Sequence, residues 1–154
     1  YLYRLYLDNE LATNRFPVHG QRVRLSDIRV PMFVVGTETD HVAPWKSVYK
    51  VDNLVRSDDF TFLLTSGGHN AGIICGPVHP KRHYRIKTRR LADPHLAPED
   101  WMEAATKHDG SWWPAWQGWL AAHSGAKVKP PAIGAPAKGY KAIADAPGTY
   151  VKQR

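Results

Sequence analysis

Two short apolar runs, each followed by polar residues and glycine, restrict the folds open to this chain more than any other feature. Residues 30–35 read Val-Pro-Met-Phe-Val-Val, and residues 60–65 read Phe-Thr-Phe-Leu-Leu-Thr. Near-continuous apolar runs of this length predict strands that are covered on both faces. Between them, apolar residues recur at three- and four-residue spacing over 45–55, which predicts a helix with one apolar face. A strand, a helix and a strand in this order predict a right-handed crossover with parallel strands, and hence an α/β fold.

An acid and a histidine stand just beyond the ends of these two predicted strands. Asp40 lies in Thr-Glu-Thr-Asp-His after the first strand, and His69 lies in Ser-Gly-Gly-His-Asn after the second. The carboxyl ends of parallel strands meet at one edge of a sheet, where sites in open α/β sheets gather. We therefore expect His69 to act as a general base, with Asp40 beside it to hold the ring. The plainer alternative is that Asp40 caps a helix or belongs to an ordinary loop.

A catalytic pair of this kind needs a nucleophile, and the sequence holds none in the expected setting. No Gly-x-Ser-x-Gly or Gly-x-Cys-x-Gly turn is present. In α/β-hydrolases the order along the chain is nucleophile, acid, histidine, and Asp40 before His69 follows that order. We therefore expect the nucleophile upstream of Tyr1. The single cysteine, Cys75, follows the histidine in an apolar setting, and we interpret it as a small buried hydrophobic residue.

The chain divides into four segments around this unit. We expect the end of a cap or connector region at 1–24, which opens with the tail of a helix over 1–12. The strand–helix–strand unit is expected at 25–75, an extended piece with two helices at 76–124, and a tail rich in Pro, Gly, Ala and Lys at 125–154. In the third segment, residues 83–88 predict an extended piece. One helix is predicted to open at Pro98 and to end before Gly110, and a second to run from Ser111 to Ser124.

Composition and charge argue against several classes of function. The 154 residues carry a formal charge of +7, which favours anionic partners, but no nucleic-acid recognition motif accompanies it. The eight histidines form no metal-binding motif, and no cofactor motif is present, so we expect neither a metal nor a cofactor. No run of about eighteen apolar residues predicts a membrane span, and a lone cysteine fits a reducing compartment. With no leader before Tyr1, these features predict a piece of a larger cytoplasmic protein.

Four short motifs carry a family resemblance. They are Asp-His-Val-Ala-Pro-Trp at 40–45, Gly-His-Asn-Ala-Gly at 68–72, Gly-Ser-Trp-Trp-Pro-Ala-Trp at 110–116 and Ala-Pro-Gly-Thr-Tyr-Val at 146–151. Together they resemble the carboxyl-terminal third of the polyhydroxyalkanoate synthases, also called poly(3-hydroxyalkanoate) polymerases. The resemblance covers nearly the whole chain, and the long tail looks more like class I and II than class III members. It implies the carboxyl-terminal portion of an α/β-hydrolase fold.

The resemblance implies an acyltransferase that polymerises 3-hydroxyacyl groups and releases coenzyme A. In this family a cysteine in a Gly-x-Cys-x-Gly turn takes the acyl group, so His69 would activate that cysteine as a thiolate. Asp40 would either orient His69 or help to deprotonate the 3-hydroxyl of the incoming unit, and both roles stay open. This chain alone is then expected to be inactive.

The resemblance also implies partners and a location. The coenzyme A thioester is a substrate rather than a cofactor, and the growing polyester is held by the same enzyme. The other expected partners are the rest of the catalytic domain, a second subunit of the same kind and granule-associated proteins. The expected location is the surface of a polyhydroxyalkanoate granule in the cytoplasm.

Residues beside the pair are candidates for shaping the substrate pocket. His41 and Trp45 follow the acid, and Gly68 and Asn70 flank the histidine. For His41 and Trp45 we expect packing behind the pocket rather than direct chemistry.

Two further patterns have both a structural and a functional interpretation. Trp112, Trp116 and Trp119 form a stripe at helical spacing, for which we expect packing, with polymer or granule binding as the alternative. Residues 79–90 hold six Lys or Arg residues and no acid. Because the charges alternate with other side chains, we expect the solvated face of a strand, with attraction of coenzyme A phosphates as the alternative.

Two other classes of function stay open. One is an ordinary α/β-hydrolase of the esterase kind, and the other is a non-enzymatic basic and aromatic module that binds an anionic polymer or a granule surface. The sequence upstream of Tyr1 would discriminate between them, because each enzyme has its own nucleophile turn. A sheet without its other strands would also expose an apolar edge, so we expect the chain to self-associate.

Overall fold

The computed structural model describes residues 1–79 and 81–153, which form two separate units, Tyr1–His123 and the segment from Ser124 onward. The first unit contains η1 (Leu2–Leu7), β1 (Pro17–Val18), β2 (Gln21–Arg22), η2 (Leu25–Asp27), β3 (Met32–Thr37), α1 (Trp45–Tyr49), η3 (Lys50–Asn53), β4 (Asp59–Thr65), α2 (His69–Ile73), β5 (His83–Arg90), α3 (Pro98–Ala104), β6 (Thr106–Asp109) and α4 (Trp113–Ala122). The second contains η4 (Pro136–Lys138) and η5 (Tyr150–Lys152).

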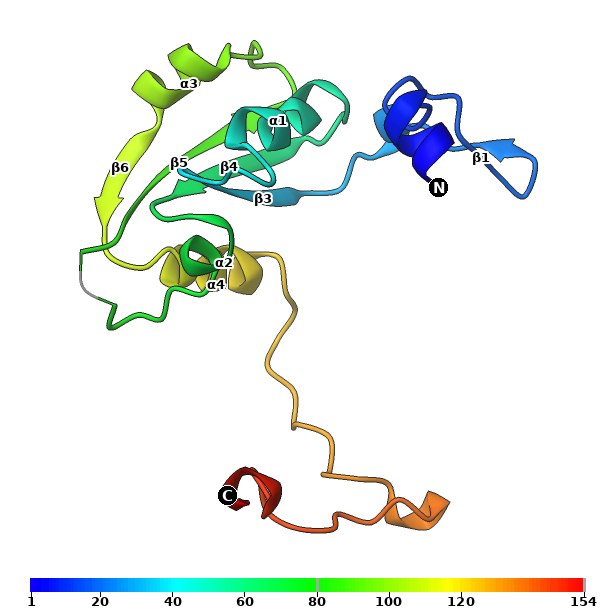
Figure 1. The fold of residues 1–154 in the computed structure, drawn as a ribbon, viewed down its shortest axis with the longest axis vertical. Helices are drawn as coiled ribbons and strands as arrows, with labels where there is room; N and C mark the ends of the chain where they lie inside the picture. Colours follow the sequence, from blue (N-terminus) through cyan, green and yellow to red (C-terminus); the bar gives the residue numbers. More distant parts are fainter. Residues whose placement is uncertain (80, 154) are drawn as a thin grey trace. The chain divides into compact units, whose positions relative to one another are not determined.

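Four strands of the first unit form a mixed sheet in the order β3-β4-β5-β6 (Figure 1). β3 and β4 are parallel, with Met32 opposite Phe60 and Thr37 opposite Thr65. β5 runs antiparallel to β4, and β6 runs antiparallel to β5. The predicted parallel strand–helix–strand unit is therefore confirmed, and the chain has an α/β fold.

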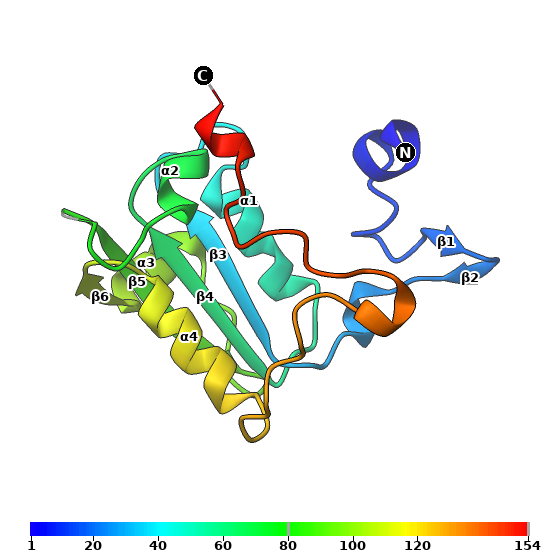
Figure 2. The ribbon, with the colours of Figure 1, turned by 90° about the horizontal axis from the view of Figure 1, so that it is seen from below.

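Successive side chains of β4 enter two different cores, because neighbouring residues of a strand point to opposite faces of the sheet. Phe62 packs with Trp101 on the face that carries α1 and α3. Leu63 packs with Cys75 and Trp112 on the face that carries α2 and α4. Figure 2 shows α4 running beside β4, and Figure 1 shows α1 and α3 on the side of the sheet opposite α4. The sheet is thus the middle of three layers.

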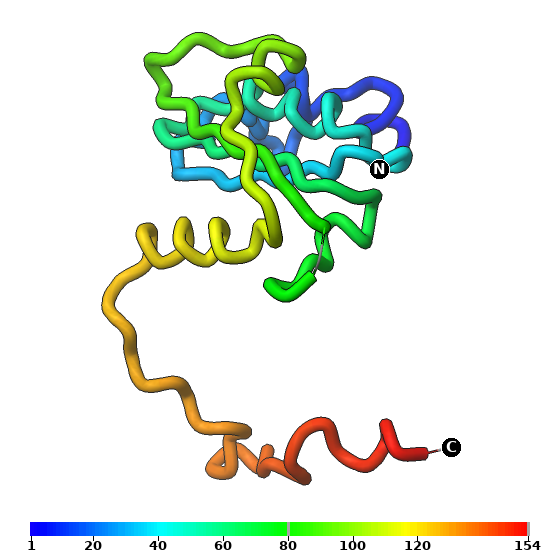
Figure 3. Tube along the Cα trace, turned by 90° about the vertical axis from the view of Figure 1, so that its left-hand side faces the viewer, coloured from blue at the N-terminus to red at the C-terminus, as the bar shows by residue number. Residues whose placement is uncertain are grey.

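Two predicted helices differ from the structure. The helix expected over 45–55 is short: α1 ends at Tyr49 and continues as the 3-10 turn η3. The helix expected to reach Gly110 ends at Ala104, and Thr106–Asp109 form β6 instead. The reason is tertiary, because these residues hydrogen-bond to the free edge of β5, and a long-range pairing overrides local preference. Figure 3 follows the chain from this strand into α4.

The ends of the chain are simpler. The expected helical tail at the start is the single turn η1, in which Leu2 and Tyr6 are 70% and 78% exposed. β1 and β2 follow and pair as antiparallel strands of two residues each. The segment from Ser124 holds two 3-10 turns and an isolated bridge between Ala135 and Tyr140. Across residues 1–79 and 81–153, no helix is both long and apolar enough to span a bilayer.

Candidate active site

The loop after β3 holds the carboxylate of Asp40 with three donors of its own segment. Its Oδ1 accepts hydrogen bonds from the backbone N–H groups of Val42 at 2.8 Å and Ala43 at 2.9 Å. Its Oδ2 accepts one from the Thr37 hydroxyl at 3.2 Å. This loop continues the parallel pairing of the strands, since the N–H of Glu38 donates to the carbonyl of Thr65. Asp40 is therefore fixed by the end of β3 and by its own turn.

The imidazole of His69 lies against this carboxylate. His69 is the first residue of α2, which begins directly after the Gly67-Gly68 turn at the end of β4. Its Nδ1 lies 2.9 Å from Asp40 Oδ2. The Asp40 side chain is 7% exposed, whereas that of His69 is 49% exposed. The structure thus brings together the acid and the base that the sequence placed at one edge of the sheet.

Hydrogen bonding determines which ring nitrogen of His69 is available as a base. The pKa of Asp40 is held well below its usual range, mainly by the hydrogen bond from the N–H of Ala43. His69 and the N–H of Val42 lower the pKa further, whereas desolvation raises it. At neutral pH the carboxylate is therefore charged and can only accept hydrogen bonds. His69 Nδ1 must then carry the proton that points to Asp40, and in the neutral ring Nε2 keeps its lone pair.

The Nε2 atom of His69 faces no protein partner in the part of the chain that the structure describes. No hydrogen bond or ion pair joins it to residues 1–79 or 81–153. The free thiol of Cys75 is buried at 0% exposure, packed with Leu63 and Trp112. Its interpretation as a buried hydrophobic residue is confirmed. The described residues therefore place an acid and a base side by side, with Nε2 of the histidine free of protein partners among them.

The four other predicted site residues lie near the pair without contacting it. Trp45 packs in the core, its ring centroid 6.0 Å from that of Trp101, in agreement with the expected packing role. His41 is exposed, and no hydrogen bond or ion pair in the described chain joins it to the pair. Gly68 precedes α2, and Asn70 lies within it, where both contribute backbone carbonyls to the helix.

Sequence reasoning missed a second acid–histidine contact at the same edge of the sheet. The Nε2 of His83 lies 3.1 Å from Glu38 Oε1 and 3.2 Å from Oε2. The N–H of His83 also donates to the Ser66 hydroxyl at 3.1 Å. These contacts tie the start of β5 to the loops that carry Asp40 and His69. A usable signal was the position of Glu38, two residues before Asp40 and also beyond the strand.

Side chains at the start of α4 hold the helix that carries the histidine. Trp112 is 5% exposed, and its Nε1 donates to the carbonyl of Gly72 at 3.1 Å. Trp113 Nε1 donates to the carbonyl of Ile73 at 3.0 Å. The Ser111 hydroxyl donates to the carbonyl of Cys75. The expected packing role is confirmed for Trp112, and the start of α4 holds the end of α2 in place.

The basic run differs in part from its predicted solvated face. Residues 83–90 form β5 as a strand. The Arg89 side chain, however, is only 13% exposed, and its Nε donates to Asp52 at 2.6 Å. The prediction is therefore wrong for Arg89, because Asp52 of η3 pairs with it. Asp52 is too distant in sequence for a local pattern to reveal this contact. Arg90, 64% exposed and paired with Asp59, fits the prediction better.

Close packing between α2 and β3 gives a first prediction. A Cβ atom added at Gly72 would lie 2.5 Å from Thr37 Cγ2 and 3.0 Å from its Cβ, and Thr37 is 2% exposed. Relief of this overlap requires α2 or β3 to shift. Gly72→Ala is therefore expected to lower the free energy of unfolding, measured by urea denaturation, by about 1–3 kcal/mol. The matched control is Gly118→Ala in α4, where nothing lies within 4 Å. The control is expected to be neutral or slightly stabilising, and equal losses in both variants would contradict this packing.

An acid and a base at the carboxyl ends of adjacent parallel strands, in a sheet with helices on both faces, are typical of α/β enzymes. Comparison with known proteins finds relatives of similar sequence. Over 155 residues the chain is 39% identical to the poly(3-hydroxyalkanoate) polymerase subunit PhaC of Cupriavidus necator, covering 100% of this chain and 25% of that protein. It is 37% identical to the Rhizobium etli subunit, of which it covers 23%, and 36% identical to the Methylorubrum extorquens polymerase, of which it covers 24%. No protein-family model matches the chain.

The chain is thus homologous to the poly(3-hydroxyalkanoate) polymerases, and the resemblance expected from its motifs is confirmed. It spans about a quarter of the length of the curated relatives that it matches.

Proposed function

We propose that this chain is the carboxyl-terminal catalytic portion of a polyester synthase and supplies its acid and base. The observation that carries the proposal is the contact between His69 Nδ1 and Asp40 Oδ2, in a homologue of polymerases. The substrate class is a 3-hydroxyacyl thioester of coenzyme A. The nucleophile is a cysteine of the synthase that lies upstream of these residues in the amino-acid sequence. The growing polyester remains on the enzyme at a granule surface.

Acyl transfer to the enzyme uses Nε2 of His69. This nitrogen takes the proton of the cysteine thiol, and the resulting thiolate attacks the thioester carbonyl. The bond from the carbonyl carbon to the sulfur of coenzyme A then breaks, and the imidazolium returns the proton to that sulfur. The products are an acyl-cysteine thioester and free coenzyme A. Throughout, Asp40 holds the ring and stabilises its charged form.

Chain growth uses the same base in a second step. Nε2 of His69 takes the proton of the 3-hydroxyl of an incoming 3-hydroxyacyl-coenzyme A, whose oxygen attacks the acyl-cysteine carbonyl. An ester bond forms, the carbon–sulfur bond breaks, and the cysteine sulfur leaves as a thiolate that the imidazolium reprotonates. The lengthened chain is then the acyl group of that coenzyme A thioester, and the first step returns it to the cysteine. Repetition of the two steps lengthens the polyester by one unit each time.

The surroundings of Asp40 favour the orienting role over direct deprotonation of the substrate. Both carboxylate oxygens already accept hydrogen bonds, and the side chain is 7% exposed. A carboxylate whose pKa lies far below neutrality is also a weak base for a hydroxyl group. The half-exposed imidazole of His69 is the better placed group for both proton transfers.

A chimaera tests the proposed function. The 155 residues of the Cupriavidus necator polymerase that match this chain are replaced by it, and the same polymerase with that part deleted serves as the control. The chimaera is expected to release coenzyme A from 3-hydroxybutyryl-coenzyme A and to form insoluble polyester, whereas the deleted protein does neither. A chimaera that is folded by circular dichroism but releases no coenzyme A would count against the proposal.

A further inference from the structure

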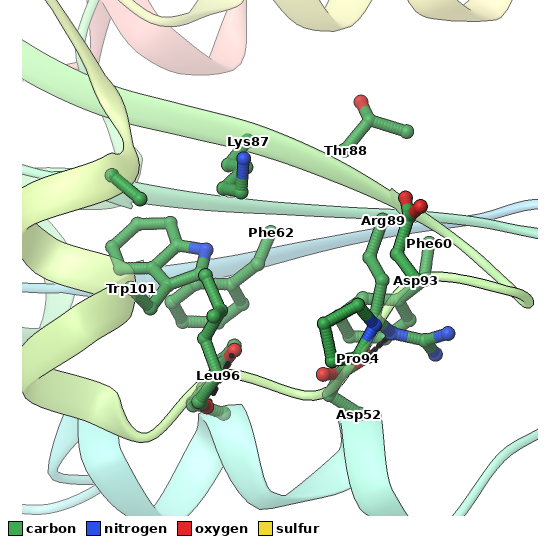
Figure 4. Close-up of a pocket in the computed structure, with 12 residues that line it drawn as sticks. Asp52, Phe60, Phe62, Lys87, Thr88, Arg89, Asp93, Pro94, Leu96 and Trp101 are labelled. Carbon is green, nitrogen blue, oxygen red and sulfur yellow. Dashed lines mark hydrogen bonds and ion pairs between the residues drawn. The ribbon is translucent and has the colours of Figure 1, made fainter.

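A pocket of about 410 Å³ opens on the face of the sheet that carries α1 and α3 (Figure 4). This volume falls in the range of small-molecule sites, roughly 300–1,000 Å³. Asp40 and His69 are not among its lining residues. Nothing in the proposed function uses this pocket, so a ligand bound there would be independent of that function.

Aromatic side chains form the apolar part of the pocket. Phe60 and Phe62 of β4 are each 1% exposed, and Trp101 of α3 is 3% exposed. The rings of Phe62 and Trp101 meet edge to face, with centroids 4.9 Å apart. Leu96 adds an aliphatic wall. Such a lining suits an apolar chain, since its burial against these rings removes apolar surface from water.

Two hydrogen-bond donors at one end of the pocket have no protein partner in the described chain. The indole N–H of Trp101 makes no hydrogen bond to residues 1–79 or 81–153, and it is not among the side-chain atoms there that are fully buried without a partner. The amine of Lys87 likewise has no hydrogen bond or ion pair within that part of the chain. Lys87 is opposite Phe62 in the strand register, so both side chains share the face with the pocket. Figure 4 shows Lys87 beside Trp101 and Phe62.

The remaining charged groups of the pocket are already paired. Arg89 Nε donates to Asp52 Oδ1 at 2.6 Å, and Asp52 Oδ2 lies 2.6 Å from His95 Nδ1. Asp93 Oδ2 accepts the N–H of Arg90 at 2.8 Å. Figure 4 shows both acids toward the Phe60 end, away from Lys87. Among the described residues that line the pocket, Lys87 is therefore the uncommitted cation, at the end opposite the carboxylates.

We propose that this pocket binds a small amphipathic carboxylate, such as a medium-chain fatty acid anion. Its apolar chain lies along Phe62 and Phe60, and its carboxylate accepts hydrogen bonds from the Lys87 amine and the Trp101 indole N–H. One charged and one neutral donor match the two oxygens of a carboxylate, which accepts without needing to donate. Binding satisfies two donors that the described chain leaves without partners and covers the apolar wall.

Titration of octanoate into the 154-residue chain, followed by nitrogen–proton correlation NMR, tests the proposal. The indole N–H resonance of Trp101, identified from its absence in Trp101→Phe, is expected to shift and to saturate below the micelle concentration of octanoate. Lys87→Gln is expected to weaken binding by about tenfold, since a charge-assisted hydrogen bond is lost. Octanol, which has a similar chain and no charge, is expected to bind the unmodified protein more weakly and to be insensitive to Lys87→Gln.

The matched control is Lys107→Gln, which removes the same charge from the neighbouring strand β6, outside the pocket lining. It is expected to leave octanoate binding unchanged within about twofold, because exposed charges at this distance are screened. The proposal is overturned if the Trp101 resonance does not move, if octanol binds as well as octanoate, or if Lys87→Gln and Lys107→Gln have equal effects. Lys87 is only partly buried, so Lys87→Gln is expected to fold. This variant therefore tests the proposal even if Trp101→Phe is unstable.

Discussion

Replacing His69 by asparagine in the chimaeric polymerase is expected to lower the rate of coenzyme A release by about a thousandfold or more. Asparagine can still donate a hydrogen bond to Asp40, but it has no titratable nitrogen to take a proton from a thiol or hydroxyl. The loss should be large because one base serves both acyl transfer to the enzyme and ester formation. Release of coenzyme A, followed with a thiol reagent, measures the change.

The control for this variant is His108→Asn, which removes a histidine of the same sheet that stacks on Tyr84 at 5.0 Å. It is expected to keep the rate within about threefold, as for surface substitutions away from special features. A His69 variant that retained more than about a tenth of the rate would show that another group is the base, because loss of a true general base costs at least a hundredfold.

Replacing Asp52 by alanine is expected to lower the free energy of unfolding by about 3 kcal/mol. The Asp52 side chain is 1% exposed and is the counter-ion of Arg89, whose guanidinium lies 5.7 Å from the centre of the Phe60 ring. It also lies 2.6 Å from His95 Nδ1, and so joins η3 to the loop before α3. Without it, a cation that is only 13% exposed is left without its partner. Urea unfolding followed by circular dichroism measures the change.

Asp58→Ala is the matched control for Asp52, since Asp58 is an exposed acid between η3 and β4. It is expected to change the free energy of unfolding by less than about 0.5 kcal/mol. Similar values for the two variants would contradict a stabilising role for the buried network. Loss of stability in Asp52→Ala would leave the proposed chemistry at Asp40 untouched, because neither Asp52 nor its partners contact that pair.

The sheet edge that carries the candidate site could be predicted because its signals are local. The apolar run that became β4 is buried from Phe60 to Thr65, whereas β3 is only partly buried over its first four residues. The short helical connection between them forces parallel strands. From that geometry, the contact between Asp40 and His69 follows from their places just beyond each strand. The role of Trp112 as a packing residue also followed from helical spacing, although its hydrogen bond to Gly72 did not.

The features that could not be predicted depend on partners distant in sequence. β6 forms because β5 offers a free edge, and residues 105–109 carry no strong strand pattern of their own. The burial of Arg89 depends on Asp52, 37 residues away, and the contact of Glu38 with His83 spans 45 residues. Sequence periodicity describes the face of one element, so it does not identify which charged side chains meet across two elements.

Release of coenzyme A from 3-hydroxybutyryl-coenzyme A, measured side by side for the isolated 154-residue chain and for the chimaera, tests most directly whether this chain supplies an acid and a base without their nucleophile. We predict no release by the isolated chain, release by the chimaera, and loss of that release in the His69→Asn chimaera. Release by the isolated chain that survives His69→Ala would contradict the proposed division of the site.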